Sequence, residues 1–312
     1  MSVQKPKSLS IEEFVRSVTM FYIDPVLEAE YAKTVDSQVA ALQTKLLGIA
    51  TPGGLEKYVI EDPEALDNIT SLLNISEEKF KRIITMLRIE KRHTPTSEWT
   101  LSKVREQMIS SPYFMKEICD LLSHGATMEK YAALIPAFYL ENFMIDASTL
   151  GRLASADDIR RLVKKGMEGG YNNKLGDSYF NAVAKVITDY CDRKGLTYDI
   201  KKSVPAYGKV MSITIPSASN PRIVIDITYG ITTSSTQTKY AERAEAVASK
   251  IRVRNEGRQD RDKYVFINIV DGAGWVARQS DLNKLERCSD ILTNLKNLII
   301  VENAIDYYLL ED

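Results

Sequence analysis

Histidine and cysteine are scarce in this chain of 312 residues. The two histidines, His93 and His124, leave little room for a metal site built on several imidazoles and read most simply as surface or helix-end residues. The three cysteines, Cys119, Cys191 and Cys288, are widely spaced and odd in number. That pattern favours reduced structural thiols over a disulfide framework or a zinc site.

Long apolar runs are also absent. No stretch of about 18 apolar residues occurs, and residues 1–7 lack the apolar core of a signal peptide. With 44% hydrophobic and 27% charged residues, the chain is expected to be globular and cytoplasmic, without a membrane partner. Its length suits one large domain or two ordinary ones.

The net charge of −1 argues against a surface that binds polyanions everywhere, but a local basic patch remains compatible with it. Between Lys239 and Lys263 there are eight basic residues and five acidic ones. This excess indicates either a site for an anionic partner or a solvated helix face of mixed charge.

The chain changes character near its middle. Residues 8–165 carry helix signals, among them the capping-box pattern of Ser10 and Glu13 and an apolar stripe through Phe80, Ile84 and Leu87. From residue 166 onward, strand patterns alternate with helical ones. We therefore expect a helical region over residues 1–165 and an α/β region with a mixed sheet over residues 166–312.

Residues 166–177 are polar and rich in glycine, which predicts a loop, with Asp177 or Ser178 capping the helix that follows. A loop that opens a helix beside basic side chains suits a phosphate group, and Asn172, Asn173 and Lys174 supply donors for phosphates or base edges. Glycine-rich turns also precede helices in proteins that bind nothing there, so this signal alone is weak.

A β-hairpin is predicted from residues 209–215 and 223–229, joined by the turn at 216–221. Its second strand is apolar except for Asp226 and Thr228. A carboxylate in a buried strand requires a cation, a metal or several donors, because an unpaired buried ion is costly. If the faces of the two strands coincide, Ser212 and Thr214 join Asp226 and Thr228 in one polar patch.

The remaining elements complete the α/β region. A Ser/Thr-rich loop over residues 230–236 leads into a helix at 239–250, followed by a buried strand at 264–270 and a turn at 271–275. In that turn the glycines are expected to supply positive φ angles, and Trp275 is expected to act as a packing anchor. The apolar run at 298–301 is predicted to be a last strand.

The order of these landmarks resembles the type II restriction endonucleases that cut at GATC. The Asn-rich segment ending in Gly176-Asp177, the hairpin, the Ser/Thr loop, the helix with Ala241 and the sequence Asp271-Gly272-Ala273-Gly274-Trp275 follow one another as in that group. The resemblance covers residues 166 to 305, while the helical half is similar only in length and character. It implies a nuclease core of the PD-(D/E)xK kind, Mg²⁺-dependent hydrolysis of both strands of double-stranded DNA, and a homodimer.

Residue roles follow from the same resemblance. Asp226 takes the position of the second metal-binding acid, Thr228 the polar position two residues later, and the carbonyl of Ile227 that of a further ligand. The position of the first acid falls on or near Ser212, so Asp177 or Asp199 is the nearest substitute. The candidate DNA contacts come instead from residue chemistry and position, and the alternative reading of those after the Asp226 strand is ordinary surface residues. They are Asn172, Asn173 and Lys174 before the hairpin, and Thr233, Ser234, Lys239 and Arg243 after the Asp226 strand.

Three interpretations remain open from the sequence. The chain is an active endonuclease, a DNA-binding protein that keeps the nuclease fold without cleavage, or an α/β protein that binds a small molecule. The helical half is expected to embrace DNA, to supply dimer contacts or to gate access.

Overall fold

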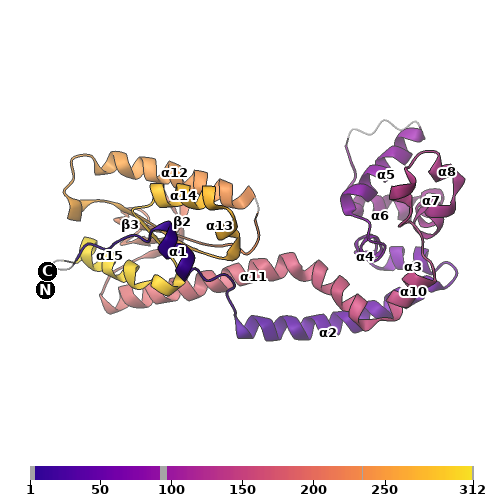
Figure 1. Cartoon of the computed structure of the whole chain (residues 1–312), viewed down its shortest axis with the longest axis horizontal. Helices are drawn as coiled ribbons and strands as arrows, with labels where there is room; N and C mark the ends of the chain where they lie inside the picture. Colours follow the sequence, from indigo (N-terminus) through magenta and orange to yellow (C-terminus); the bar gives the residue numbers. More distant parts are fainter. Residues whose placement is uncertain (1–3, 92–96, 234, 311–312) are drawn as a thin grey trace. The chain divides into compact units, whose positions relative to one another are not determined.

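A computed structural model describes residues 4–91, 97–233 and 235–310 (Figure 1). The chain forms two compact units. One contains residues 29–169, and the other contains residues 1–28 together with residues 170–312. The helices α2 (Pro25–Leu47) and α11 (Ala156–Arg193) each contribute residues to both units. The fold is α/β, with a helical region before a mixed sheet that is flanked by helices.

The unit of residues 29–169 is helical throughout its described part. Ser76 caps helix α5 by accepting a hydrogen bond from the amide of Lys79, and the predicted stripe of Phe80, Ile84 and Leu87 is buried in the core of this unit. The helices that pack around this core are α3 (Gly54–Glu61), α4 (Ala65–Leu72), α5 (Glu77–Glu90), α6 (Leu101–Ser110), α7 (Pro112–His124), α8 (Glu129–Ala132), α9 (Ala137–Leu140) and α10 (Ala147–Ala154).

The other unit is built on a five-stranded sheet in the order β1-β2-β3-β4-β5. The predicted hairpin is present, because β2 and β3 pair antiparallel, and β1 is antiparallel to β2. Strands β4 and β5 continue the sheet in parallel to β3. The strand bounds are β1 (Asp199–Val204), β2 (Lys209–Ile215), β3 (Ile223–Tyr229), β4 (Val265–Asp271) and β5 (Ile291–Thr293).

Helices cover both faces of this sheet (Figure 1). Helices α12 (Ser235–Asn255) and α14 (Gln279–Cys288) pack with the short α13 (Ala273–Ala277) against the face that carries Val224 and Phe266. The C-terminal part of α11 and α15 (Ile299–Leu309) cover the opposite face, which carries Ile225 and Ile267. Alternating apolar side chains along β3 and β4 thus serve two separate cores, as expected for strands buried on both sides.

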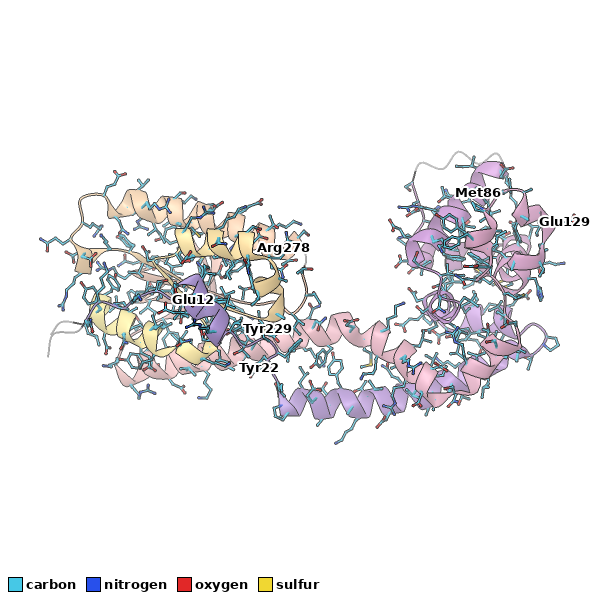
Figure 2. The ribbon with its side chains drawn as sticks, in the orientation of Figure 1. Glu12, Tyr22, Met86, Glu129, Tyr229 and Arg278 are labelled. Carbon is cyan, nitrogen blue, oxygen red and sulfur yellow. The ribbon has the colours of Figure 1, made fainter. Side chains whose placement is uncertain are left out.

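The first residues of the chain belong with the sheet. Helix α1 (Ile11–Ser17) begins with the predicted capping box of Ser10 and Glu13, and Phe14 is fully buried. Backbone hydrogen bonds then tie residues 9–20 to β5 and to the turn after β4. Figure 2 shows Tyr22 beside Tyr229, with ring centroids 6.3 Å apart. The division expected after residue 165 placed this segment in the helical region, whereas the structure places it with the sheet.

The glycine-rich loop predicted over residues 166–177 is wrong, because α11 runs through it without interruption. Ser155 caps the helix by accepting from the amide of Asp158, so neither Asp177 nor Ser178 is a cap. Leu175 and Tyr179 are buried, and Tyr179 packs in the core on the sheet and donates a hydrogen bond to Asp271 at the end of β4. Their packing offsets the helix propensity lost at each glycine, about 1 kcal/mol relative to alanine.

The strand predicted at residues 298–301 is also wrong. Leu298 and Val301 are buried while Ile299 is 58% exposed, a helical spacing, and the segment opens α15. A run of four apolar residues does not distinguish a strand from a buried helix segment. The fifth strand lies at Ile291–Thr293 instead.

The few cysteines and histidines lie in different surroundings. Cys119, Cys191 and Cys288 are all buried and free, as predicted for structural thiols. His124 is exposed at the end of α7, and His93 lies outside the described residues. Within the part of the chain that is described, no helix is long and apolar enough to cross a membrane.

Candidate functional site

Asp226 lies in the middle of β3 and is only 4% exposed. Strand alternation points its side chain to the same face as Val224, toward α12, while Ile225 and Ile227 point to the opposite core. The hairpin register pairs Thr214 with Val224, which confirms that Ser212, Thr214, Val224 and Asp226 share one face of the sheet.

Both carboxylate oxygens of Asp226 have partners. Arg243 Nη2 on α12 lies 3.3 Å from Oδ2, and the Ser212 hydroxyl donates to Oδ1 over 2.9 Å. Burial raises the pKa of this carboxyl, and the Arg243 charge and the Ser212 hydrogen bond oppose that rise. The Asp226 carboxylate, whose burial without a partner would be unfavourable, is therefore held in an ion pair supported by hydrogen bonds.

Ser212 occupies the point where the regular ladder of the hairpin ends. The last paired residues are Ile213 and Ile225, and beyond them the Ser212 hydroxyl accepts a hydrogen bond from the amide of Ile227 at 3.0 Å. One hydroxyl thus satisfies both the strand amide and the carboxylate. Serine at this position supports Asp226 and adds no negative charge.

Polar contacts continue from Asp226 toward β4. Asn268, opposite Asp226 in the parallel register, is fully buried and accepts a hydrogen bond from the hydroxyl of Tyr240 at 3.1 Å. Its amide nitrogen donates to Ser289 at 2.8 Å. Burial, followed by the nearby Asp226 charge, raises the pKa of Tyr240 well above its usual value, so this phenol stays protonated.

A cavity of about 420 Å³ opens at this end of the sheet, and we call it the Asp226 cavity. It brings together most of the predicted site residues, although they come from α11, β2, β3 and α12. The predicted residues in its wall are Asn172, Asn173, Asp177, Ser212, Asp226, Ile227, Thr228 and Arg243. The asparagines and Asp177 reach it from one side of a helix, not from the predicted loop.

Lys201 also lines the Asp226 cavity, and no sequence pattern indicated a role for it. Its φ angle is +49°, in the left-handed region that lysine seldom adopts, and it lies on the edge strand β1. Its ammonium group is 3.7 Å from an oxygen of Asp177 and 4.1 Å from the ring centroid of Phe180. Backbone strain of this kind is often found where a side chain must be aimed at a functional site.

The oxygen atoms around the cavity are of the kind that Mg²⁺ prefers. Two carboxylates, Asp226 and Asp177, line it together with Ile227 and the hydroxyls of Ser212 and Thr228. Mg²⁺ is often bound through one or two carboxylates with substrate phosphates and water completing its shell, so this donor set is compatible with the ion. The described residues form no cluster of three or more acidic, histidine or cysteine ligands, and Arg243 would have to release Asp226.

The remaining predicted DNA contacts lie outside the cavity wall. Lys174 is exposed on α11, Thr233 is exposed in the loop before α12, and Lys239 is exposed on α12. Ser234 lies outside the described residues. Asp199, the other substitute acid, does not line the Asp226 cavity and accepts hydrogen bonds from Ala218 and Lys202.

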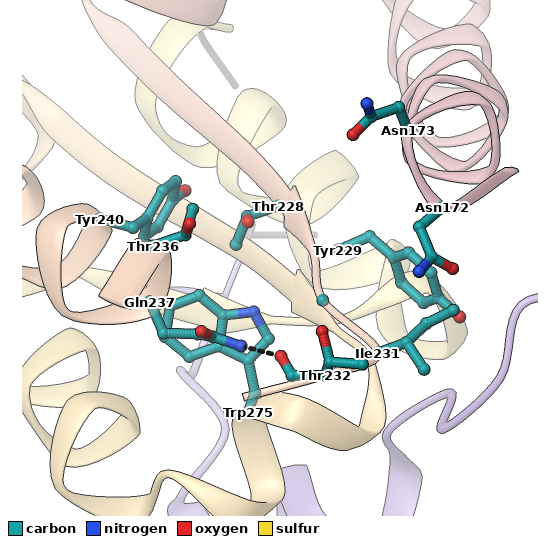
Figure 3. A pocket seen from close by; sticks show the side chains of 11 residues that line it. Asn172, Asn173, Thr228, Tyr229, Ile231, Thr232, Thr236, Gln237, Tyr240 and Trp275 are labelled. Atoms are coloured by element: carbon teal, nitrogen blue, oxygen red, sulfur yellow. Dashed lines mark hydrogen bonds between the residues drawn. The ribbon is translucent and has the colours of Figure 1, made fainter. Parts of the chain in front are cut away.

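A second pocket of about 220 Å³ adjoins the first (Figure 3). We call it the Trp275 pocket. The two cavities share Asn172, Asn173, Thr228, Tyr229 and Tyr240 in their walls. The residues that line only the second are Gly230, Ile231, Thr232, Thr236, Gln237 and Trp275.

The turn after β4 forms the floor of this pocket. Trp275 is 1% exposed, and Gly272 has a φ angle of +108°, as the sequence led us to expect. A Cβ atom at Gly274 would lie 2.4 Å from the carbonyl oxygen of Thr232, so the turn approaches the Ser/Thr loop too closely for any other residue. Asp271 accepts hydrogen bonds from Thr19, Tyr179 and Leu295, which makes it a structural acid.

Comparison with known proteins adds one family. Residues 149–300, a little under half of the chain, match the family model described as the BanI C-terminal domain. That segment carries the five strands and the Asp226 cavity. This part of the chain is therefore similar to a restriction-endonuclease domain.

A solved complex of the restriction endonuclease PspGI with substrate DNA also resembles the chain. It is 12% identical, covers 65% of this chain and 92% of that chain, and superposes with a TM-score of 0.29. A search of curated proteins finds no match.

Proposed function

We propose that this chain is a type II restriction endonuclease that hydrolyses phosphodiester bonds in double-stranded DNA with Mg²⁺. The observation that carries the proposal is the Asp226 cavity, which is lined by two carboxylates, by Ile227 of β3 and by two cationic side chains. The cavity lies in the segment that is similar to the BanI C-terminal domain. A phosphodiester needs cations around its oxygens and an oxygen ligand set for a metal, and this cavity offers both.

Asp226 is the principal carboxylate of the proposed site. Asp226, the Ile227 carbonyl and Asp177 would hold Mg²⁺, which when bound polarises the phosphate and makes water nucleophilic near neutral pH. Thr228, two residues after Asp226 on the same strand, is suited to orient the attacking water. Ser212 holds Oδ1 of Asp226 in place.

Positive side chains would balance the charge that develops on the phosphate. Lys201 and Arg243 both line the cavity, and each is paired with a carboxylate in the free protein. When a phosphate enters, either cation can exchange its carboxylate for phosphate oxygens. The proposed DNA contacts are Asn172, Asn173 and Arg243 in the wall and Lys174, Thr233 and Lys239 outside it. Ser234 is proposed from the sequence alone, since it lies outside the described residues.

A DNA-binding protein without cleavage is the second candidate, and one observation favours it. Asp226 is already neutralised by Arg243, and Ser212 supports it where the resembling group carries an acid. In that case the cavity would bind a DNA phosphate through its cations alone.

One experiment separates the two. The full chain is incubated with unmethylated plasmid and genomic DNA, with and without Mg²⁺, and the ends of any fragments are sequenced. Discrete fragments with a shared end sequence support the endonuclease. Salt-dependent binding with no cuts under Mg²⁺ or Mn²⁺ supports the binding protein.

The proposed enzyme would act as a homodimer, since a palindromic site presents the same sequence to two copies. The helical unit of residues 29–169 would then supply DNA contacts, dimer contacts or gating. Sedimentation of the full chain with and without DNA tests the stoichiometry, and a complex with a single copy per duplex argues against the dimer.

A further inference from the structure

We propose that the Trp275 pocket is a nucleobase subsite, which takes one unpaired base of the strand whose phosphate lies in the Asp226 cavity. The inference rests on the proposed function, because it assumes that a phosphodiester occupies the neighbouring cavity. From the sequence, Trp275 was expected only to pack.

The two adjoining cavities differ in charge. The Asp226 cavity is lined by Asp177, Lys201, Asp226 and Arg243, which suits an ionic group. The described residues that line the Trp275 pocket include no charged side chain. A nucleotide has the same division, since its phosphodiester is ionic and its base is neutral, so two joined cavities of this kind match its two parts.

The chemistry of the Trp275 pocket is that of a base edge. Asn172, Asn173 and Gln237 carry carboxamides, each with both a donor and an acceptor, and Thr232 and Thr236 add hydroxyls. Figure 3 shows these groups around the pocket together with the rings of Tyr229, Tyr240 and Trp275. Aromatic faces stack on bases, and amide groups pair with their donor and acceptor edges.

One donor in this pocket has no partner. The indole nitrogen of Trp275 is buried and makes no hydrogen bond to any described residue. A buried donor left unpaired is unfavourable, so an acceptor that reaches it is favoured. The carbonyl and ring nitrogens of a base are acceptors of this kind.

Gly230 leaves space beside that donor. A Cβ atom at this position would lie 3.5 Å from the indole nitrogen and 3.2 Å from the amide nitrogen of Gln237. The amide nitrogen of Gln237 already donates to the carbonyl oxygen of Thr232 at 2.6 Å, so the indole N–H is the donor whose neighbouring space a Cβ atom at Gly230 would narrow. The pocket volume of about 220 Å³ is several times the share of one water molecule, roughly 30 Å³, so a single bound water does not fill it.

The base must be unpaired to reach this position. Trp275 lies at the base of the turn after β4 with 1% of its surface exposed, and a base inside a duplex keeps its ring stacked between neighbours. Only a base that has left the stack can present an edge to a donor buried in this way.

The chain allows a direct optical test, because it contains only two tryptophans, Trp99 and Trp275. Trp99 packs on Phe114 and Arg88 in the helical unit, so Trp99→Phe keeps an aromatic ring there and leaves Trp275 as the single indole fluorophore. The full-length variant is titrated with an unlabelled single-stranded oligonucleotide and with an unlabelled abasic oligonucleotide of equal length. Binding of each is followed separately by fluorescence anisotropy of labelled copies.

We expect both oligonucleotides to bind, since both carry phosphates, and only the one with bases to quench Trp275. We expect Gly230→Ala to remove the quench and to lower the preference for the base-bearing strand roughly tenfold, the size of one lost stacking contact. Binding of the abasic strand should change less than twofold. Gly151→Ala is the matched control, because a Cβ atom at Gly151 meets nothing within 4 Å.

Trp275→Phe provides a second measurement should Gly230→Ala not fold, as judged by circular dichroism. It removes the unpaired N–H and keeps an aromatic anchor, and we expect the same loss of preference for bases. Equal quenching by the abasic strand, or an unchanged preference in both variants, overturns the subsite while DNA binding stands. If neither oligonucleotide binds, the subsite is overturned, and the cleavage experiment on plasmid DNA decides the proposed function separately.

Discussion

The hydroxyl of Ser212 joins the two strands of the hairpin at Asp226. It donates to Oδ1 of Asp226 at 2.9 Å and accepts from the amide of Ile227 at 3.0 Å. Arg243 completes the arrangement from α12 with an ion pair of 3.3 Å to Oδ2. The carboxylate is therefore held in one orientation at the wall of the Asp226 cavity, and substitutions around it give separable predictions.

Asp226→Asn is expected to abolish DNA cleavage while keeping the shape of the side chain. The amide removes the charge that would bind a metal, so we expect activity to fall by at least about a hundredfold, comparable to the loss of one electrostatic group from an active site. Plasmid nicking under Mg²⁺ measures it. Asp189→Asn, an exposed acid on α11 paired with Lys185, is the control and should cut normally. Full activity of Asp226→Asn would remove Asp226 from the mechanism.

Arg243→Met is expected to destabilise the protein by roughly 3 kcal/mol at neutral pH, the low end for removal of one partner of a buried ion pair, since Arg243 is partly exposed. Burial already raises the folded-state pKa of Asp226 above its unfolded value of 3.8, and loss of Arg243 raises it further.

The sign of the pH dependence follows from that shift. A carboxyl with a raised folded pKa favours the folded state when protonated, so its contribution is present below about pH 3.8 and is lost as the pH rises through the folded pKa. The variant should therefore lose more stability, relative to the parent, at pH 7 than at pH 5. Urea unfolding at the two pH values measures this, and an equal loss at both would contradict it.

Ser212→Asp tests whether the cavity accepts a hard cation. A second carboxylate beside Asp226 adds like-charge repulsion, and we expect a lower melting temperature in chelator. Mg²⁺ should reverse that loss, since two adjacent carboxylates bind it better than one. Thermal melts with EDTA, Mg²⁺ and matched NaCl follow the effect. Recovery in NaCl alone would assign the change to screening and not to a bound metal.

Lys201→Gly is expected to separate stability from function. Glycine adopts a φ of +49° without strain, so the fold should gain about 1 kcal/mol or stay unchanged. Loss of the ammonium group from the cavity should weaken DNA binding. The slope of the logarithm of the binding constant against the logarithm of salt concentration should fall by about the share of one phosphate contact. Lys202→Gly, at the next position of β1, is the control and should lower stability instead. Unchanged DNA binding by Lys201→Gly would exclude a role for Lys201 at the site.

Local elements could be predicted from the sequence where their patterns involve only residues that are close together in the chain. The capping box at Ser10, the apolar stripe of α5, the hairpin around Asp226 and the glycine turn before Trp275 all follow from periodicity and backbone sterics, which neighbouring residues set. The sequence also indicated that Asp226 needs a partner, because burial of a lone charge is unfavourable wherever it occurs.

The contact partners of the site residues, and the type of two secondary-structure elements, depend on the tertiary structure. Burial of Leu175 and packing of Tyr179 on the sheet favour a helix in a segment whose glycines favour a loop. Burial of Leu298 and Val301 favours a helix in an apolar run. The pairing of Asp226 with Arg243, the entry of Lys201 into the cavity and the unpaired indole of Trp275 depend on contacts between elements far apart in the chain. Such contacts are set by how layers pack, and no local pattern encodes them.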